Sequence, residues 1–278
     1  MAKVTVRAIA CVIATFLIAP TFIVVPLALS TSAFLEFPPP GWSTRWFDQF
    51  FSDPQWTNAL TRSLEVATGA MVLAVVLGFA AAYALVRSRS RFLGWFEPVL
   101  LLPMMVPIIV YAIAAYGVAL TVGLVGSMWL LMAAQAVIAL PYVLLNLSAA
   151  LRTTDPRLEL VAQSLGAPPH VAFRKVLLPL ITPAVAGAGL IAFALSLDET
   201  VVALFLTADG SPTLPVQMYS SIRYQLNPLV PVAATIMMGI WIVIVVLVGL
   251  IHRQALRRGG RQTSIEPDIG ESLTPTYP

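Results

Sequence analysis

The stretch Asp155–Pro179, DPRLELVAQSLGAPPHVAFRKVLLP, is the longest polar interval between apolar segments in the interior of this chain. Asp155 and the proline after it form a helix start, because the side chain accepts a hydrogen bond and proline has no amide to leave unpaired. Gly166 is expected to end this helix, since glycine takes the left-handed C-terminal geometry without steric cost. Pro168-Pro169 then begin a second helix. The pattern predicts two short helices bent at a glycine.

The first of these helices has one apolar face. Its apolar residues recur at i, i+3, i+4 and i+7, at Leu158, Val161, Ala162 and Leu165. Such a face is buried against something, and two interpretations are open from the residues alone. The segment is either a loop helix lying on a membrane surface or an element that docks on a partner protein.

The composition of the chain places it in a membrane. Of 278 residues, 59% are hydrophobic and 10% are charged, and the mean hydropathy is +0.88. A soluble domain has about a quarter of its residues charged. The single cysteine, Cys11, lies in an apolar run, which excludes a disulfide framework and a cysteine-based metal site. The basic residues are scattered between apolar segments, so the net charge of +3 indicates topology and not a nucleic-acid partner.

Six apolar segments are long enough to cross a bilayer, which takes about 20 residues. They cover residues 8–30, 62–86, 97–121, 127–150, 180–206 and 229–251. The sequence therefore predicts an all-α integral membrane protein with a single transmembrane domain, residues 1–258, and a disordered tail, residues 259–278. The first segment is expected to be retained, because its apolar stretch exceeds the core of a signal peptide. Pro103, Pro107 and Pro141 predict kinks within spans.

The distribution of Lys and Arg gives an orientation. In this layout two precede the first span, three follow the second, four lie in residues 151–179 and four follow the sixth, which makes 13 of 16. Arg45, Arg62 and Arg223 are left on the other side. Because basic residues collect on the cytoplasmic side of membrane proteins, both termini and the 151–179 loop are predicted to be cytoplasmic.

Residues 31–60 then form an external loop that is rich in aromatic side chains. These are Trp42, Trp46, Phe47, Phe50, Phe51 and Trp56. Aromatic residues favour the membrane–water boundary, so the loop is expected to contain a short interfacial helix that anchors the chain there.

The chain contains no Walker A loop, no HExxH or GxSxG motif, and no cluster of metal-ligating residues. Its two histidines, His170 and His252, lie at span boundaries. The sequence therefore predicts no catalysis and no cofactor in this chain. Energy for transport would come from an ion gradient or from a partner that hydrolyses ATP, and the predicted cytoplasmic helix pair favours the partner.

A second informative place is the pair Asp198-Glu199 near the far end of the fifth segment. From Pro183 to Asp198 a helix rises about 22 Å, within a hydrocarbon core of about 30 Å. Ionisable residues at such depth face a cavity or a partner group. The pair either lines a transport path or is structural, bonded to Arg223 or to backbone at a helix break. Adjacent residues diverge by about 100° on a helix, so Asp198 is assigned to the path and Glu199 to Arg223 or a partner-subunit group.

The glycine-bent segment resembles the cytoplasmic EAA loop of permease subunits of ATP-binding-cassette (ABC) importers. That loop has a Glu-Ala-Ala, a glycine four residues after the second alanine, and a later Leu-Pro. The matching residues are Ala162, Gly166, Leu178 and Pro179, with Leu165 and Ala167 beside the glycine. The resemblance implies that a cytoplasmic ATPase docks on this loop through Asp155, Glu159, Ala162, Gly166, Ala167 and Pro179.

The loop departs from the family pattern at two positions. Leu160 stands where the family has Glu, and Val161 stands where it has the first alanine. Glu159 is one residue early, and one helical step turns it by about 100°. Glu159 is therefore not expected to make the polar contact usual in the family.

The C-terminal half is similar to permeases of the polyamine (spermidine/putrescine) type. The similar runs are SLDETVVALFLT, TLPVQMYSSIRYQLNP and PVAATIMMGI, and the likeness is specific within residues 155–235. It implies a bacterial inner-membrane subunit that pairs with a second permease, two ATPases that bind ATP and Mg, and an extracytoplasmic solute-binding protein. The implied solute is a small organic cation. An importer for an opine or amino-acid derivative is the alternative, followed by a gradient-driven transporter, which would need a second copy of the LDET feature.

Overall fold

The computed structural model describes residues 2–88, 91–207, 211–224 and 227–262. Regular structure in these ranges is helical, apart from an isolated bridge between Ser30 and Trp42. The helices are α1 (Ala2–Ala28), α2 (Arg45–Ser52), α3 (Pro54–Arg87), α4 (Arg91–Gly94), α5 (Phe96–Leu101), α6 (Ile108–Thr121), α7 (Met128–Thr153), α8 (Arg157–Ser164), α9 (Pro169–Ala172), α10 (Leu178–Leu197), α11 (Val201–Leu206), α12 (Leu214–Tyr224) and α13 (Leu229–Gln262). The all-α prediction is confirmed.

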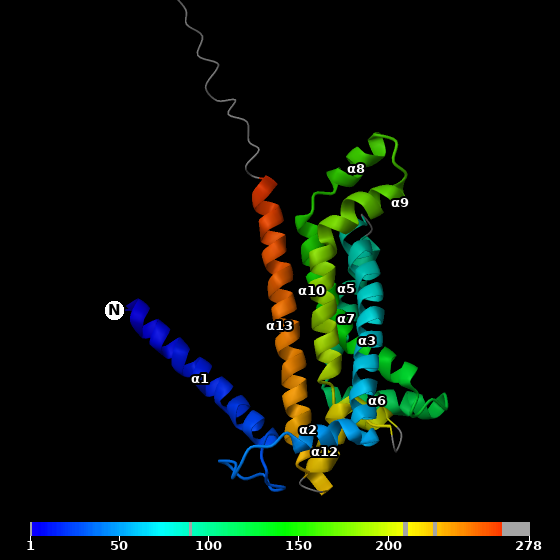
Figure 1. Cartoon of the computed structure of the whole chain (residues 1–278). Helices are drawn as coiled ribbons and strands as arrows, with labels where there is room; N and C mark the ends of the chain where they lie inside the picture. The colour runs from blue at the N-terminus through cyan, green and yellow to red at the C-terminus, as the bar shows by residue number, and fades with distance from the viewer. Residues whose placement is uncertain (1, 89–90, 208–210, 225–226, 263–278) are drawn as a thin grey trace, which may run out of the picture.

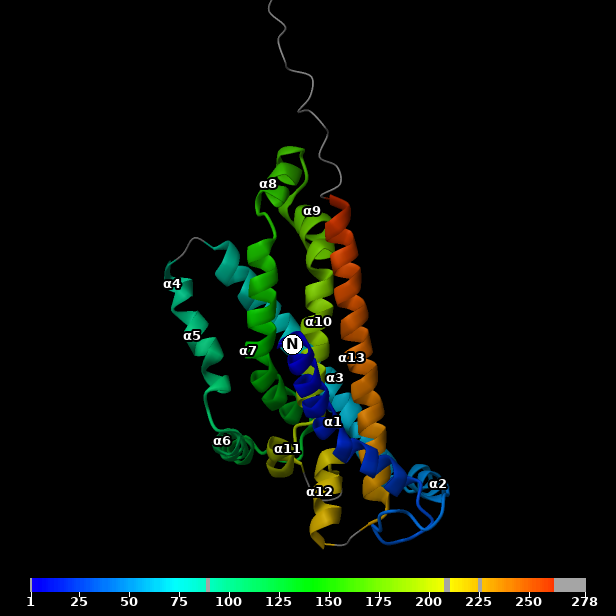
Figure 2. The same ribbon diagram turned by 90° about the vertical axis from the view of Figure 1, so that its left-hand side faces the viewer.

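Four long helices, α3, α7, α10 and α13, run side by side along the bundle (Figures 1 and 2). The helices α8 and α9 lie at one end, and α2, α6 and α12 lie at the other. The core between α3, α7 and α10 is built from small and aliphatic side chains such as Ala74, Leu144, Leu147 and Ala188. The predicted interval between the fourth and fifth spans is thus placed beyond one end of the bundle.

The tightest helix contact is between α3 and α7. A Cβ built on Gly78 would lie 2.7 Å from Cγ1 of Val143, and one built on Gly69 would overlap Met132. Glycine at these positions lets the two backbones approach closely, as is common between transmembrane helices. The pair α3–α7 therefore forms the closely packed centre of the bundle.

The predicted third span, 97–121, is not one helix. It is divided into α5, a 3-10 turn (Leu102–Met104) and α6, and the two parts are bent by 100°. Pro103 and Pro107 lack amide donors, and Pro107 takes an extended ψ of 130° immediately before α6. The kink expected from these prolines is confirmed, but it is large enough to turn α6 across the bundle (Figure 2).

The predicted fifth span, 180–206, was also wrong as a single helix. It ends at Leu197, and α11 begins again at Val201. The break occurs because the Glu199 carboxylate accepts hydrogen bonds from the amides of Val202 and Ala203, at 2.8 and 3.0 Å. A side chain that binds these free amides starts a new helix at this point.

Four described helical stretches are long and apolar enough to cross a membrane: 54–87, 128–153, 169–197 and 229–251. The bent pair α5–α6 provides a fifth if it is one span. Helix α1, which corresponds to the first predicted span, diverges from the bundle. Its own C-terminal end lies near the N-terminal end of α13 (Figure 1). The six-span layout and the positions of both termini stay predictions.

The short helix expected within residues 31–60 is confirmed as α2, while the external location of this loop stays a prediction. The anchoring role is wrong for Trp46, Phe50 and Trp56, which are buried with Leu214 and Leu229 in a core cluster. Aromatic surface of this size stabilises a core when other elements cover it. Trp42 and Phe51 are exposed, as an anchoring role requires.

The predicted disordered tail, residues 259–278, is wrong in its first four residues. Helix α13 continues to Gln262, so residues 259–262 are helical. Residues 263–278 lie outside the described part of the chain.

Candidate functional site

The loop between α7 and α10 begins and bends where the sequence predicted. The Asp155 carboxylate accepts a hydrogen bond of 2.8 Å from the Arg157 amide at the start of α8. Gly166 has a φ of +88°. Its amide donates to the Gln163 carbonyl at 2.9 Å, and the Ala167 amide donates to the Ala162 carbonyl at 3.1 Å. These two bonds are the paired closure of a Schellman motif, which requires a left-handed residue at the glycine position.

The apolar face predicted for α8 points away from the protein. Leu158, Val161 and Leu165 are exposed, and Leu165 is 84% exposed. Ala162 and Ala167 are half-buried, and Pro179 is exposed. Since α8 lies beyond the end of the long helices (Figure 1), its apolar residues form an uncovered surface at that end.

Glu159 points in the opposite direction, toward the protein, and is 9% exposed. Its Oε1 lies 3.2 Å from Nε of Arg87, the last residue of α3. The Tyr83 hydroxyl donates to its Oε2 at 3.3 Å. Leu160, which stands at the position of the family's Glu, is 60% exposed, so it and Glu159 face different sides of α8. Neither Arg87 nor Tyr83 was singled out from the sequence, because nothing local connects residues 72 or more positions apart.

The second short helix of the loop, α9, continues through a π-helical turn (Phe173–Leu177) into α10. Phe173 packs edge-on against Phe79 and Tyr83 of α3, with ring centroids 5.8 Å apart in both pairs. Leu177 is buried beside them. Both arms of the loop therefore contact the same end of α3.

Asp198 directly follows Leu197, the last residue of α10, and it is exposed. Within the described ranges, its carboxylate makes no hydrogen bond or ion pair. A carboxylate that no described residue neutralises is available to a cationic ligand or to a group on another subunit.

Glu199 is held by α11 and by α7. Besides the two amides of α11, it accepts a hydrogen bond of 3.3 Å from Nε2 of Gln135, and Oε1 of that glutamine accepts from the Ser196 hydroxyl. The predicted pairing of Glu199 with Arg223 is wrong, because the ion pairs found among the described residues are Arg87–Glu159 and Arg152–Glu97. The alternative, a group on a partner subunit, stays a prediction. The structural alternative, bonding to backbone at a helix break, holds for this residue.

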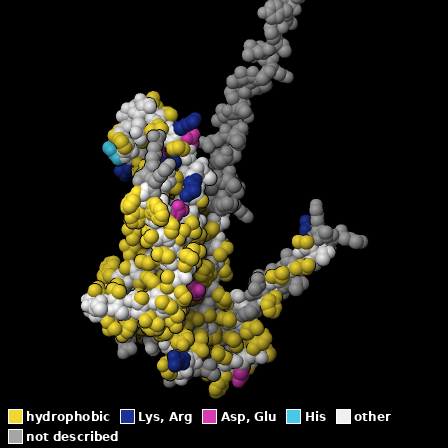
Figure 3. Space-filling model, turned by 180° about the vertical axis from the view of Figure 1, so that it is seen from behind, with side chains coloured by type: hydrophobic (Ala, Val, Ile, Leu, Met, Phe, Trp, Pro, Cys, Tyr) yellow, Lys and Arg dark blue, Asp and Glu magenta, His cyan; other side chains and the backbone are white. Residues whose placement is uncertain are grey.

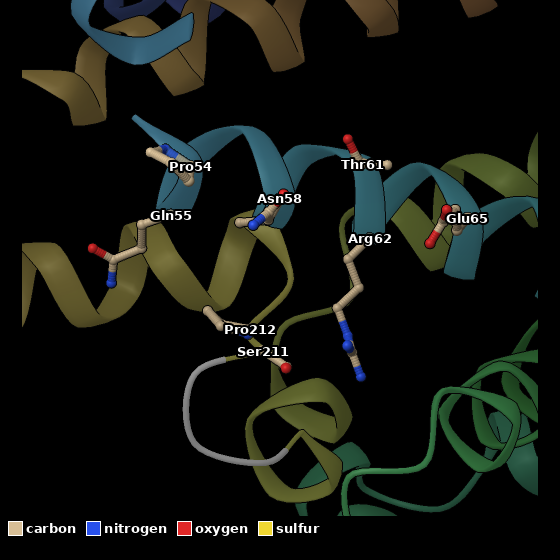
Figure 4. A pocket seen from close by; sticks show the side chains of 9 residues that line it. Pro54, Gln55, Asn58, Thr61, Arg62, Glu65, Ser211 and Pro212 are labelled. Carbon is tan, nitrogen blue, oxygen red and sulfur yellow. The ribbon is translucent and has the colours of Figure 1, made fainter. Parts of the chain in front are cut away.

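A polar cavity of about 550 Å³ is lined by the residues labelled in Figure 4, and it lies at the end of the bundle opposite to α8 (Figure 1). It lies between the first turns of α3 and the segment before α12, and it is lined mainly by Gln55, Asn58, Arg62, Glu65, Ser211 and Pro212. Nη2 of Arg62 donates to the Gly126 carbonyl at 3.3 Å. Ser63 accepts a 2.7 Å hydrogen bond from the Leu214 amide, so this end of α3 is also tied to its neighbours.

The basic residues lie toward the two ends of the molecule, and the surface between them is mainly apolar. Hydrophobic side chains cover most of the bundle between its ends (Figure 3). The basic residues Arg87, Arg152, Arg157, Arg174 and Lys175 belong to the end that carries α8, whereas Arg45, Arg62 and Arg223 belong to the other. In the described ranges, no three His, Cys, Asp or Glu residues are grouped as metal ligands.

The sequence matches known proteins over most of its length. Residues 74–259 match the family described as the binding-protein-dependent transport system inner membrane component. The putrescine transport system permease protein PotI of Escherichia coli strain K12 is 32% identical over 259 residues, covering 89% of each chain. The spermidine/putrescine permease protein PotC of Haemophilus influenzae is 33% identical over 77% of this chain and 83% of its own.

The fold also matches solved structures. A chain from the crystal structure of a bacterial ABC transporter that imports the acidic polysaccharide alginate superposes with a TM-score of 0.68 at 16% identity. The match covers 90% of this chain and 95% of the other. At this level of identity the likeness concerns the fold alone.

Proposed function

The chain belongs to the family of binding-protein-dependent inner membrane transport components, and on that premise we propose that it imports a polyamine with energy from a partner ATPase. It is a multi-pass membrane permease subunit of an ABC importer, and its role is transport and not catalysis. The identity of the solute, the partner subunits of the chain and the orientation of the chain in the membrane are the proposed parts.

The observation that carries the coupling is the outward apolar face of α8. Leu158, Val161 and Leu165 would enter a cleft on a cytoplasmic ATPase, because burying apolar side chains of this size is favourable by about 1.5–3 kcal/mol each. The left-handed turn at Gly166 sets the angle between α8 and α9, and this angle would present α8 to the cleft. Asp155, Ala162, Ala167 and Pro179 shape the same loop.

Docking is tested by placing a charge on that face. In a complex co-expressed with its ATPase, Leu165→Glu should abolish co-purification of the ATPase while leaving membrane insertion unchanged. Leu35→Glu is the matched control, because Leu35 is also exposed but lies in the predicted external loop. Full co-purification with Leu165→Glu would remove the docking assignment.

In this proposal the end with α8 and the last turns of α13 are cytoplasmic, in agreement with the excess of basic residues there. ATP and Mg would be bound by two ATPase subunits, with no cofactor in this chain. A second permease would pair with the long helices, and an extracytoplasmic solute-binding protein would deliver solute at the opposite end. Helix α1 and the bent pair α5–α6 would complete six spans.

Two observations support a polyamine as solute. The relatives PotI and PotC are named for putrescine and for spermidine/putrescine. Asp198 offers a carboxylate that is unpaired within the described residues, at the break between α10 and α11 of an otherwise apolar bundle. A di- or triammonium ion loses its hydration in such a bundle at large cost, and a fixed carboxylate would offset part of that cost.

The solute is tested with the complete importer in proteoliposomes. ATP-dependent uptake of labelled putrescine should be competed by spermidine and left unchanged by an equal concentration of an opine or a neutral amino acid. Competition by the opine alone would contradict the polyamine assignment, while uptake of any solute that depends on ATP and on the binding protein would still support the importer.

A further inference from the structure

The proposed docking helix α8 is fastened to α3 by its one buried charge. Glu159 lies on the side of α8 opposite to Leu158, Val161 and Leu165. The side chains of Arg87 and Glu159 are 15% and 12% exposed. A carboxylate removed from water to this extent is stable when it is paired and hydrogen-bonded, and Arg87 and Tyr83 supply both interactions.

Arg87 joins three elements at one point. It is the last residue of α3, it forms the ion pair with α8, and its Nη2 donates to the carbonyl of Thr154 after α7 at 3.3 Å. A guanidinium at a helix C-terminus is also favoured by the helix dipole. The guanidinium is thus held in place by Thr154 through its Nη2, while its Nε, which makes no hydrogen bond, forms the ion pair with Glu159.

Tyr83 connects the second arm of the loop to the same place. Its hydroxyl bonds Glu159, and its ring packs edge-on against Phe173 beyond α9. Phe79 contacts Phe173 one turn earlier on α3. A displacement of either arm of the loop would thus displace the last two turns of α3 through these contacts.

Helix α3 extends from this contact to the opposite end of the molecule. Its 34 residues rise about 51 Å as one continuous helix. At the far end Arg62 bonds Gly126 in the turn before α7, and Ser63 bonds Leu214 of α12. A rigid rod that is bonded at both ends transmits a movement of the loop to the face where the polar cavity opens.

We propose that the Arg87–Glu159 ion pair, supported by Tyr83, is the link through which α8 moves α3 when the ATPase closes. Glu159 is then a positioning residue that faces its own chain and does not contact the ATPase. This inference rests on the proposed docking of α8. Loss of the pair leaves α8 able to dock but free to swing without moving α3, so ATP is hydrolysed with less transport.

The test uses the complete importer and measures solute transported per ATP hydrolysed. Glu159→Gln keeps the shape and removes the charge, and it should lower that ratio by about 5-fold or more, the lower range of typical couplings between sites. The exchange Arg87→Glu with Glu159→Arg should recover part of the ratio. Glu97→Gln is the control, because it breaks an exposed pair with Arg152, 3.7 Å apart and 36% and 64% exposed, and should leave the ratio unchanged.

The outcomes separate this inference from the docking proposal. If Leu165→Glu releases the ATPase but Glu159→Gln transports at the unchanged ratio, docking holds and the link is refuted. If the ATPase still co-purifies with Leu165→Glu, the docking proposal itself is wrong. Should Glu159→Gln fail to assemble, Tyr83→Phe decides, because it removes a single hydroxyl that bonds Glu159. An unchanged ratio in Tyr83→Phe then refutes the link, and a lowered ratio supports it.

Discussion

Replacing Gly166 by valine isolates the effect of the bend between α8 and α9. Nothing lies within 4 Å of the position that a Cβ would take there, so the new side chain meets no neighbour. The cost arises from the backbone, because φ is +88° and the left-handed region costs a residue with a Cβ about 1–2 kcal/mol. A β-branched side chain adds further crowding.

Since each 1.4 kcal/mol is a factor of ten, this cost shifts the equilibrium of the loop about 5- to 30-fold away from the docking conformation. The hydrogen bonds that would be lost are those from Gly166 to Gln163 and from Ala167 to Ala162. The assay is ATPase activity of the reconstituted complex, with and without the loaded binding protein. Gly166→Val should lose most of the stimulation, while insertion in the membrane stays normal.

The control is Gly166→Asn. Asparagine visits the left-handed region more readily than other residues with a Cβ, so this variant should keep a larger part of the stimulation. Stimulation of Gly166→Val equal to that of the unchanged chain would show that the bend has no role in coupling. Equal loss in both variants would show that the glycine acts through something other than its backbone angle.

Three other perturbations test separate parts of the structure. Asp198→Asn should slow putrescine uptake about 10-fold or more while the complex still assembles, since it removes the unpaired charge; uptake at the unchanged rate would exclude Asp198 from the path. Reporter fusions should read cytoplasmic after Arg174 and external after Asp53, and a cytoplasmic signal at Asp53 would contradict the six-span layout. Gly78→Val should lower the free energy of unfolding by about 1–3 kcal/mol, as is usual when a packed contact is overfilled, because the new Cβ would lie 2.7 Å from Val143. An unchanged midpoint of thermal unfolding would show that α3 and α7 move apart at no cost.

Much of the fold followed from the sequence because its signals are local. Apolar length placed α3, α7 and α13, and the Asp155 start and the Gly166 stop placed α8. These features depend on residues within a few positions of one another. The prolines at 103 and 107 indicated a kink but not its size, since a bend of 100° depends on what α6 packs against after the break.

The site was less predictable because its contacts join distant parts of the chain. Glu159 pairs with Arg87, and Glu199 is held by Gln135 of α7. A sequence shows that such carboxylates are costly to bury, but it does not show which of many polar groups reaches them. The assignment of Glu199 to Arg223 failed for this reason. The capping role of Glu199 could have been recognised, because its partners, the amides of Val202 and Ala203, lie only three and four residues later in the sequence.

The central claim is that the loop at α8 contacts a cytoplasmic ATPase, and site-specific cross-linking tests it most directly. The chain has a single cysteine, Cys11, so a Cys11→Ser background allows one new thiol at Leu165, the most exposed position of the docking face. In membranes that contain the co-expressed importer, this thiol should cross-link to the ATPase, and a thiol at Leu35 should not. Cross-linking from Leu35 and none from Leu165 would contradict the account.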